Sequence, residues 1–234
     1  MEMKDRVVVV TGAFGELGAA VARGFAARGA RLALLDLAPP PADLQQKIGA
    51  RHLIIGGVDL AEMEGTRKAV AAAAMRFGGI DVLVNVVGGF QCQTLLEGSV
   101  ETWDQLYQMN LRTAVVSCKV ALPALIERGG GSIINVGAGA AAGRANAGMG
   151  AYAASKAGVQ KLTESLADEL KDYRVTVNAV LPSIIDTPRN RSDMPDADFT
   201  RWVKPEAIAE VVAFLASDAA RAVTGASISV PGRV

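Results

Sequence analysis

Three glycines at a spacing of three residues, Gly12, Gly15 and Gly18, separate an apolar run from a stretch of helical spacing. Glycine permits a tight turn at such a place, and the backbone amides at the start of the following helix can hold a pyrophosphate. The same spacing also fits a purely structural turn. The candidate dinucleotide site takes in the whole turn: Gly12, Phe14, Gly15, Glu16, Leu17 and Gly18.

An aspartate, Asp36, ends the next apolar run, 18 residues after Gly18. A carboxylate there can accept both hydroxyls of an adenosine ribose and repels a 2′-phosphate. No Arg or Lys lies in the glycine turn or just after Asp36 to compensate that phosphate. The sequence therefore predicts NAD(H) as cofactor, preferred over NADP(H), although an aspartate here also fits a helix cap.

Polar and small residues follow two further apolar runs. Asp59 and Leu60 come after the third run, while Asn85, Val86 and Gly88 end the fourth. Open α/β sheets bind ligands at the carboxyl ends of their strands, so we expect these residues at the same crevice. Each of them, taken singly, also fits an ordinary turn.

The elements that position these residues alternate along the chain, short β-branched runs with longer alanine-rich stretches. Such alternation predicts parallel strands joined by crossover helices. We expect an α/β fold: a single-domain Rossmann-type doubly wound sheet of about seven parallel strands flanked by helices. The expected strands cover 7–11, 31–36, 53–56, 81–85, 132–136, 175–181 and 227–230. The expected helices cover 17–28, 63–77, 100–127, 151–171 and 205–216.

The length of the chain, 234 residues, suits one large core. We therefore expect residues 1–234 to form a single NAD(P)-binding Rossmann-fold domain. The segment 187–204 is rich in Pro, Asp, Asn and Arg and is longer than an ordinary connection. It predicts either a substrate lid or a passive surface loop.

Charge and composition exclude several classes of function. Lys and Arg total 24, as do Asp and Glu, and no run of like charge would attract nucleic acid. No uninterrupted apolar run approaches the length that spans a membrane, and the apolar run near the start is too short for a signal peptide. We expect no nucleic-acid partner, no membrane association and a cytoplasmic location.

Cysteine and histidine are too scarce for a metal centre. Cys92 and Cys118 lack a metal-site spacing, and free buried thiols are the simpler interpretation. His52 is the only histidine, which excludes Ser-His-Asp catalysis and a histidine-based metal site. We expect no metal, and we expect His52 at the surface.

The run from Tyr152 to Lys156, Tyr-Ala-Ala-Ser-Lys, opens one of the expected helices. With it, the sequence resembles the short-chain dehydrogenase/reductase family over essentially its whole length. The glycine turn and the segments 59–60, 85–88, 109–111 and 182–188 follow the order of that family. The resemblance implies an oxidoreductase that transfers hydride between a nicotinamide dinucleotide and a small-molecule substrate.

The resemblance also implies catalytic roles. Tyr152 would supply or remove a proton, Lys156 would bind the nicotinamide ribose and lower the tyrosine pKa, and Asn110 would anchor a water relay. A free tyrosine titrates near pH 10, so a nearby ammonium is needed to bring the phenol toward a working pH. The spacing of four residues sets Tyr152 and Lys156 on one helix face.

The nicotinamide end of the site is implied in the same way. The segment begins at Pro182, and the Ile185 backbone and the Thr187 hydroxyl would hold the carboxamide. Ser183 replaces the glycine that usually follows this proline in the family, and the sequence does not indicate its effect.

Two further departures from the family are visible. The serine that normally polarises the substrate oxygen is missing, because Ala138, or Gly139 with another gap placement, stands there. The sequence therefore gives less support to ordinary alcohol or ketone chemistry. Glu16 stands where most members have glycine, and a carboxylate facing phosphate would be repulsive. We expect the Glu16 side chain to turn to solvent.

These departures resemble the dihydropteridine reductase branch of the family, which lacks the serine, has a shifted glycine turn and uses NADH. The Gly-Gly-Phe segment 88–90 and the loop over 181–202 add to the likeness. A quinonoid dihydropterin is a strongly electrophilic conjugated ring that accepts hydride with little carbonyl polarisation. Phe90, Trp202 and Ala138 are the candidate substrate contacts, although both aromatic residues also fit an ordinary core.

The leading hypothesis is NADH-dependent reduction of a small conjugated substrate such as a quinonoid dihydropterin. A carbonyl or alcohol dehydrogenase of the wider family, acting on 3-oxoacyl or ketone substrates, is the alternative, and a catalytically silent NAD-binding protein is the second. The long helices over 100–127 and 151–171 are apolar on more than one face, which predicts a homodimer or homotetramer.

Overall fold

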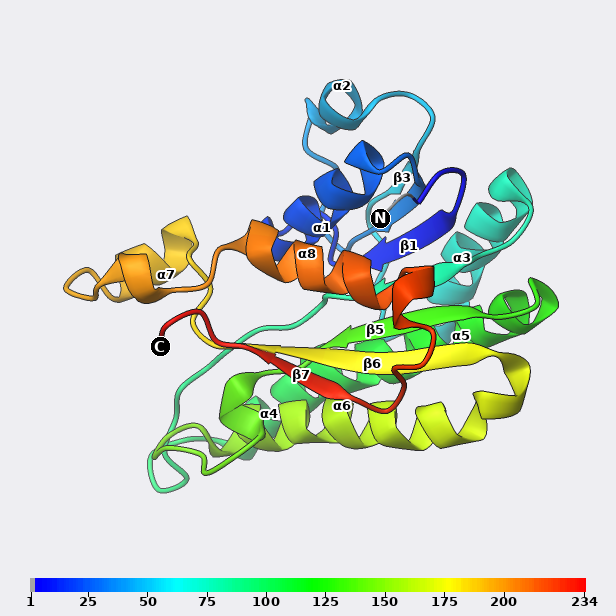
Figure 1. The fold of residues 1–234 in the computed structure, drawn as a ribbon. Coiled ribbons are helices and arrows are strands. Elements are labelled where there is room, and N and C mark those ends of the chain that lie inside the picture. Colours follow the sequence, from blue (N-terminus) through cyan, green and yellow to red (C-terminus); the bar gives the residue numbers. More distant parts are fainter. Residues whose placement is uncertain (1–2) are drawn as a thin grey trace.

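Seven parallel strands form one sheet in the order β3-β2-β1-β4-β5-β6-β7 (Figure 1). The computed structural model describes residues 3–234. The strands are β1 (Val7–Thr11), β2 (Arg31–Leu35), β3 (Leu53–Ile55), β4 (Val82–Asn85), β5 (Gly131–Val136), β6 (Val175–Pro182) and β7 (Ser227–Val230). The predicted doubly wound sheet is confirmed, with each strand within one residue of its expected bounds at either end.

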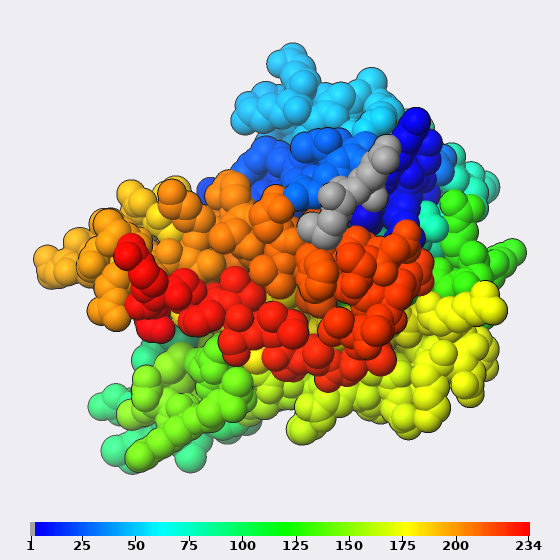
Figure 2. Space-filling model, viewed as in Figure 1, coloured from blue at the N-terminus to red at the C-terminus, as the bar shows by residue number. Residues whose placement is uncertain are grey.

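Helices cover both faces of this sheet (Figure 1). The helices α1 (Glu16–Ala27) and α8 (Pro205–Leu215) pack on one face, and α3 (Met63–Phe77), α5 (Thr113–Glu127) and α6 (Gly150–Glu169) pack on the other. Figure 2 shows α8, in orange, and the last residues of the chain, in red, forming much of the surface on the first side.

Two apolar clusters, one on each face, fix the sheet between the helix layers. Phe25 of α1 and Ile208 of α8 belong to the first cluster, and Leu125 of α5 and Leu166 of α6 belong to the second. The four valines 7–10 of β1 have no exposed surface, as expected for a strand covered on both faces. The carboxyl ends of the strands are therefore held on a rigid base.

The predicted helix over 100–127 is continuous but changes geometry at its centre. It consists of α4 (Val100–Tyr107), a π-helical turn η1 (Gln108–Arg112) and α5. Within residues 3–234, this is the single helix long and apolar enough to cross a membrane, contrary to the expectation that no segment would qualify. Its α5 part packs in the second apolar cluster, so we assign it as a core helix of the domain.

Two short helices were not expected from the sequence. These are α2 (Leu44–Ile48) and α7 (Pro188–Asp193), each too short for helical periodicity to register. The helix α7 lies inside the segment 187–204 and is followed by the 3₁₀ turn η4 (Phe199–Arg201). The Thr187 hydroxyl accepts a hydrogen bond from the Asn190 amide at 3.2 Å and so caps α7.

The position of His52 differs from the expectation. Its side chain is buried, and its Nδ1 accepts a hydrogen bond from the Leu32 amide at 3.1 Å. Burial lowers the pKa of this imidazole, because the charged form loses hydration. Of the two cysteines expected to be buried, Cys118 is buried and Cys92 is exposed.

Candidate active site

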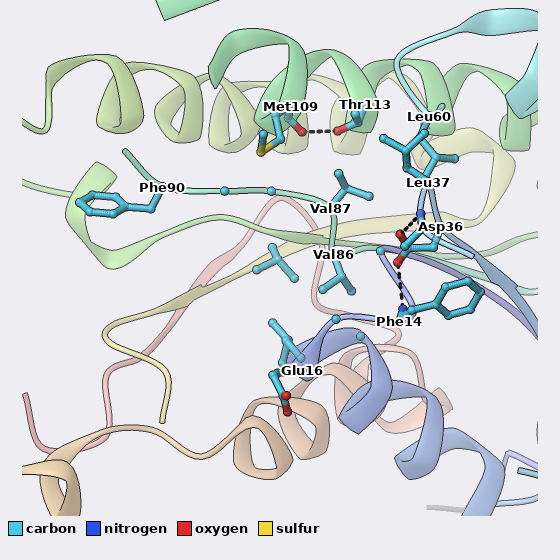
Figure 3. Close-up of a pocket in the computed structure, with 18 of the residues that line it drawn as sticks. Phe14, Glu16, Asp36, Leu37, Leu60, Val86, Val87, Phe90, Met109 and Thr113 are labelled. Carbon is cyan, nitrogen blue, oxygen red and sulfur yellow. Dashed lines mark hydrogen bonds between the residues drawn. The ribbon is translucent and has the colours of Figure 1, made fainter. Parts of the chain in front are cut away.

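A cleft of about 900 Å³ opens along the carboxyl ends of the strands. It lies where β1 and β4 are neighbours and the strand order reverses, the usual ligand position in open α/β sheets. In Figure 3, Asp36 and Phe90 lie at opposite ends, with Val86 and Val87 between them. The predicted residues that line it are Gly12, Phe14, Gly15, Glu16, Leu17, Gly18, Asp36, Asp59, Leu60, Val86, Gly88, Phe90, Tyr152, Lys156, Pro182 and Ile185.

The three glycines of the turn serve different purposes. Gly12 has φ +64°, and a Cβ there would lie 3.0 Å from the Val87 amide nitrogen. A Cβ on Gly18 would overlap the carbonyl oxygen of Gly12. At Gly15, in contrast, the nearest atom of residues 3–234 other than its chain neighbours is the Gly12 carbonyl oxygen, at 3.7 Å. The fold thus requires Gly12 and Gly18, while Gly15 leaves open space on the cleft side.

The open side of Gly15 coincides with the start of α1. Gly15 is the N-cap residue and has no side chain to cap the helix, so first-turn amides remain available for an anion. Glu16 is exposed, and Figure 3 shows its side chain directed away from Asp36, in agreement with the expectation that it turns to solvent. These features fit the pyrophosphate of a dinucleotide.

Asp36 is fixed at the other side of this turn. Its carboxylate accepts hydrogen bonds from the Phe14 amide at 2.9 Å and from the Ala38 amide at 3.0 Å (Figure 3). Apart from the outward-turned Glu16, two more carboxylates, those of Asp59 and Glu62, line the cleft, and in residues 3–234 the only cation that lines it is Lys156. The ribose end is therefore electrostatically unfavourable for an additional phosphate.

Lys156 is deeply buried between α6 and β5. Its Nζ donates a hydrogen bond to the Val136 carbonyl oxygen at 2.8 Å. Burial lowers the pKa of this ammonium to about 8. A Cβ on Gly88 would lie 2.8 Å from both Lys156 Nζ and Asn110 Oδ1, so a larger residue where the chain leaves β4 would displace the ends of these two side chains.

Tyr152 lies one helical turn before Lys156 and meets Phe90 edge to face. The ring centroids are 4.9 Å apart and the planes cross at 85°. Burial raises the pKa of the Tyr152 phenol. In residues 3–234 the Lys156 ammonium bonds to the Val136 carbonyl and not to the phenol, so the expected lowering of the Tyr152 pKa by Lys156 stays a prediction.

Asn110 ties the chain after β4 to α6 but does not line the cleft. It belongs to the π-helical turn η1, a distortion often found at functional sites. Its Oδ1 accepts a bond from the Gly89 amide at 2.8 Å, and its Nδ2 donates to the Gly89 carbonyl at 3.1 Å and to Ser155 Oγ at 2.9 Å. Asn110 thus joins the chain after β4 to α6, the helix that carries Tyr152.

Hydroxyl groups in the cleft are scarce. Ala138 is buried and brings no hydroxyl to the position of the missing serine. Besides Tyr152, the described residues that line the cleft include two hydroxyls, those of Thr113 and Ser183. Thr113 donates to the Met109 carbonyl at 2.7 Å, and Ser183 donates to the Pro231 carbonyl at 2.7 Å. Of these three hydroxyls, that of Tyr152 alone makes no hydrogen bond to a backbone carbonyl within residues 3–234.

Other predicted residues lie outside the cleft lining. Asn85 is buried, and its Nδ2 donates to Asn135 Oδ1 at 2.8 Å. The Thr187 hydroxyl caps α7, as described above. Trp202 is buried against Phe199, with ring centroids 4.8 Å apart. For Thr187 and Trp202, direct contact with a ligand stays a prediction.

Sequence reasoning also missed residues that line the cleft. Most are direct neighbours in sequence of predicted ones, so inclusion of whole strand-end segments would have found them. The exceptions come from the π-helical turn, from α5 and from α7, whose contribution needed the tertiary structure. The missed residues are Leu37, Ala38, Val58, Ala61, Glu62, Val87, Gly89, Gln108, Met109, Thr113, Val136, Gly137, Ser183 and Asn190.

Comparison with known proteins gives consistent results along the chain. Residues 6–198 match the family model described as short chain dehydrogenase. The D-threitol dehydrogenase of Mycolicibacterium smegmatis is 33% identical over 98% of this chain and 93% of its own length. The 3-oxoacyl-[acyl-carrier-protein] reductase of Thermotoga maritima is 32% identical over 99% of this chain and 98% of its own.

A solved structure agrees with these relatives. A short-chain type dehydrogenase/reductase from Mycobacterium ulcerans superposes with a TM-score of 0.91, at 27% identity, over 99% of this chain and 90% of that one. The named relatives act on several different substrates, so they support the family as a whole. The dihydropteridine reductase branch remains a hypothesis.

Proposed function

Since this chain belongs to the short chain dehydrogenase family, whose members are oxidoreductases with a nicotinamide dinucleotide, we propose that it is an NADH-dependent reductase with Tyr152 as proton donor. The observation that carries the proposal is one continuous cleft with Asp36 at one end and Tyr152 and Lys156 at the other. The glycine turn, the open start of α1 and the anchored Asp36 carboxylate fit the dinucleotide between them.

When bound, the dinucleotide supplies the hydride. The protein supplies the proton, and the raised pKa of the buried Tyr152 phenol keeps that proton in place at neutral pH. In the reduction, the phenol donates this proton to the substrate. Lys156 contributes a positive charge that can hold the ribose nearest to Tyr152.

The preference for NADH over NADPH rests on charge. Asp36 offers two carboxylate oxygens to ribose hydroxyls, and its bonds to the Phe14 and Ala38 amides prevent it from turning away. A 2′-phosphate at this place would meet Asp36 with no Arg or Lys side chain lining the cleft nearby, within residues 3–234. Repulsion between like charges would therefore disfavour NADPH.

The substrate proposed first is an electron-poor conjugated ring, such as a quinonoid dihydropterin. The support is the shortage of hydroxyl donors: Ala138 offers none, and the hydroxyls of Thr113 and Ser183 are committed to carbonyls. A ring that already accepts electrons needs less polarisation in the transition state than a ketone does. Phe90 adds an aromatic face beside Tyr152 for such a ring.

A ketone or secondary alcohol is the second candidate. The relatives named above are a sugar-alcohol dehydrogenase and a 3-oxoacyl reductase, and this chain matches both over nearly its full length. For this reaction, Tyr152 alone would both polarise the carbonyl and protonate it. We therefore expect slower turnover of ketones than of conjugated rings.

A side-by-side substrate panel tests both candidates. Oxidation of NADH is followed by absorbance with a quinonoid dihydropterin, a quinone and a β-keto ester, each corrected for the rate without enzyme. The proposal expects the fastest turnover with a conjugated ring, and it expects Ala138→Ser to raise only the β-keto ester rate, by about tenfold. A wild-type enzyme that turns over only the β-keto ester would favour the second candidate. Tight NADH binding without any turnover would favour a catalytically silent protein.

We also propose that the protein is a homodimer or a homotetramer. Large apolar side chains on the outer faces of α4 and α5 are partly or largely exposed in the single chain, among them Val100, Trp103, Tyr107 and Val115. A partner copy would remove this surface from water. Light scattering of the purified protein tests this expectation, and a monomeric mass would contradict it.

A further inference from the structure

Residues 231–233, which follow β7 and are called here the exit segment, run beside the segment 187–204 (Figures 1 and 2). The residues just before the segment 187–204 pair with Val203 near its end. Ile185 and Val203 form a parallel bridge, the Asp186 amide donates to the Val203 carbonyl at 2.8 Å, and the Val203 amide donates to the Ile184 carbonyl at 3.1 Å. We call these joined stretches, 184–186 and 201–203, the lid base.

Ser183 connects the entering side of the lid base to the exit segment. Its Oγ donates a hydrogen bond to the Pro231 carbonyl at 2.7 Å, between residues 48 positions apart. Glycine, the residue usual at this position in the family, has no group that could make this bond. The departure from the family that the sequence left unexplained thus has a specific contact in the structure.

Arg233 connects the exit segment to the returning side of the lid base. Its backbone amide donates to the Arg201 carbonyl at 2.9 Å, and its own carbonyl accepts from Arg201 Nε at 3.0 Å. Arg233 Nη2 also donates to the Thr200 carbonyl at 2.7 Å. Between the two connections, Gly232 has φ +65° and passes so close that a Cβ would lie 2.9 Å from the Arg201 carbonyl oxygen.

The lid base forms part of the cleft wall. Ile185 and Asn190 both line the cleft, and Asn190 Nδ2 donates to the Ile185 carbonyl at 2.8 Å. A shift of the lid base would therefore move this part of the wall. The exit segment contacts both sides of the lid base and so limits such a shift.

We propose that Ser183 and Arg233 are positioning residues: through the exit segment they clamp the lid base and hold Ile185 and Asn190 in place for the dinucleotide. The clamp itself is a property of the free protein. Only its effect on NADH rests on the proposed function.

Hydrogen exchange of the free protein tests the clamp without any ligand. Ser183→Ala removes the bond to Pro231, and we expect about fivefold faster amide exchange at Asp186 and Val203, as for the loss of one hydrogen bond. Ser183→Thr keeps the hydroxyl and should restore slow exchange. Arg189→Ala is the matched control, because Arg189 lies exposed on α7 and its one ion pair within residues 3–234 is with Asp193, at 3.7 Å. Unchanged exchange in Ser183→Ala, or an equal rise in Arg189→Ala, would overturn the clamp.

Titration with NADH tests the positioning role. Ser183→Ala and Arg233→Ala should each raise the NADH dissociation constant about two- to fivefold, and Ser183→Thr, which keeps the hydroxyl, should recover the wild-type value. Faster exchange with an unchanged dissociation constant would refute the positioning role. If the wild type does not bind NADH while Ser183→Ala still accelerates exchange, the proposed function fails and the clamp stands.

Discussion

The two ends of the cleft are built from different parts of the molecule. At the ribose end, Asp36 and the glycine turn act through backbone amides and a carboxylate fixed by two bonds, all within 25 residues of one another. At the other end, Tyr152 and Lys156 come from α6 and Phe90 comes from the segment after β4, while Asn110 of η1 bonds to the neighbouring Gly89. The first end is therefore suited to the ribose of the proposed dinucleotide, which is the same in every reaction. The second end would contact the substrate, which can differ.

The largest effect is expected at the substrate end. Tyr152→Phe removes only the hydroxyl and should lower kcat about 10²- to 10⁴-fold, the usual contribution of a general acid. The NADH dissociation constant should stay within about twofold, because the ring and its contact with Phe90 remain. Steady-state rates and a fluorescence titration measure the two. A loss of kcat below about tenfold would show that another group donates the proton.

At the ribose end, a substitution of Asp36 should instead change the preference between NADH and NADPH. Asp36→Ala removes the charged acceptor of the ribose hydroxyls and should weaken NADH binding about 10- to 100-fold while NADPH binding improves. Asp36 also anchors Phe14 and Ala38, so thermal unfolding must be recorded. Asp36→Asn, which keeps one acceptor oxygen, should fall between. An unchanged ratio of NADH to NADPH affinity in both variants would contradict the role of this carboxylate.

The pH dependence of NADH binding distinguishes the Lys156 end of the cleft from the Asp36 end. Burial depresses the Lys156 pKa to about 8 in the free protein, and an anionic dinucleotide would raise it. Affinity for NADH should therefore be constant below about pH 8 and fall above it, by up to tenfold per pH unit. In Lys156→Met, binding should be weak and independent of pH over that range. A wild-type affinity that does not fall above about pH 8 would mean that the Lys156 charge takes no part.

The smallest effect is expected at Phe90. Its edge-to-face contact with Tyr152 corresponds to about 0.5–1.5 kcal/mol, so Phe90→Leu should lower kcat/KM about two- to tenfold. The loss should be greater for a flat conjugated substrate than for a β-keto ester if Phe90 also contacts the ring. An equal loss of kcat/KM for both substrates would mean that Phe90 supports Tyr152 and does not contact the substrate ring.

Local patterns in the sequence predict the sheet and the ribose end. Strand runs, helical spacing and the glycine turn are properties of short segments, and the order of strands then places Asp36 beside the turn. The required glycines, Gly12 and Gly18, signal close backbone contact directly.

Contacts between distant residues escaped prediction. His52 is buried because its ring accepts the Leu32 amide, and the Lys156 ammonium bonds to Val136 and not to Tyr152. The bond from Ser183 to Pro231 likewise joins residues 48 positions apart. Spacing along the chain carries no signal for such side-chain bonds, which arise only when the strand ends are brought together.

Titration of the wild-type protein with NADH and with NADPH, under one buffer and salt condition, tests whether the anchored Asp36 carboxylate and the buried Lys156 ammonium form the two ends of a single NADH site. We predict saturable binding of NADH at least about tenfold tighter than that of NADPH. No binding of either dinucleotide, or equal binding of both, would contradict it.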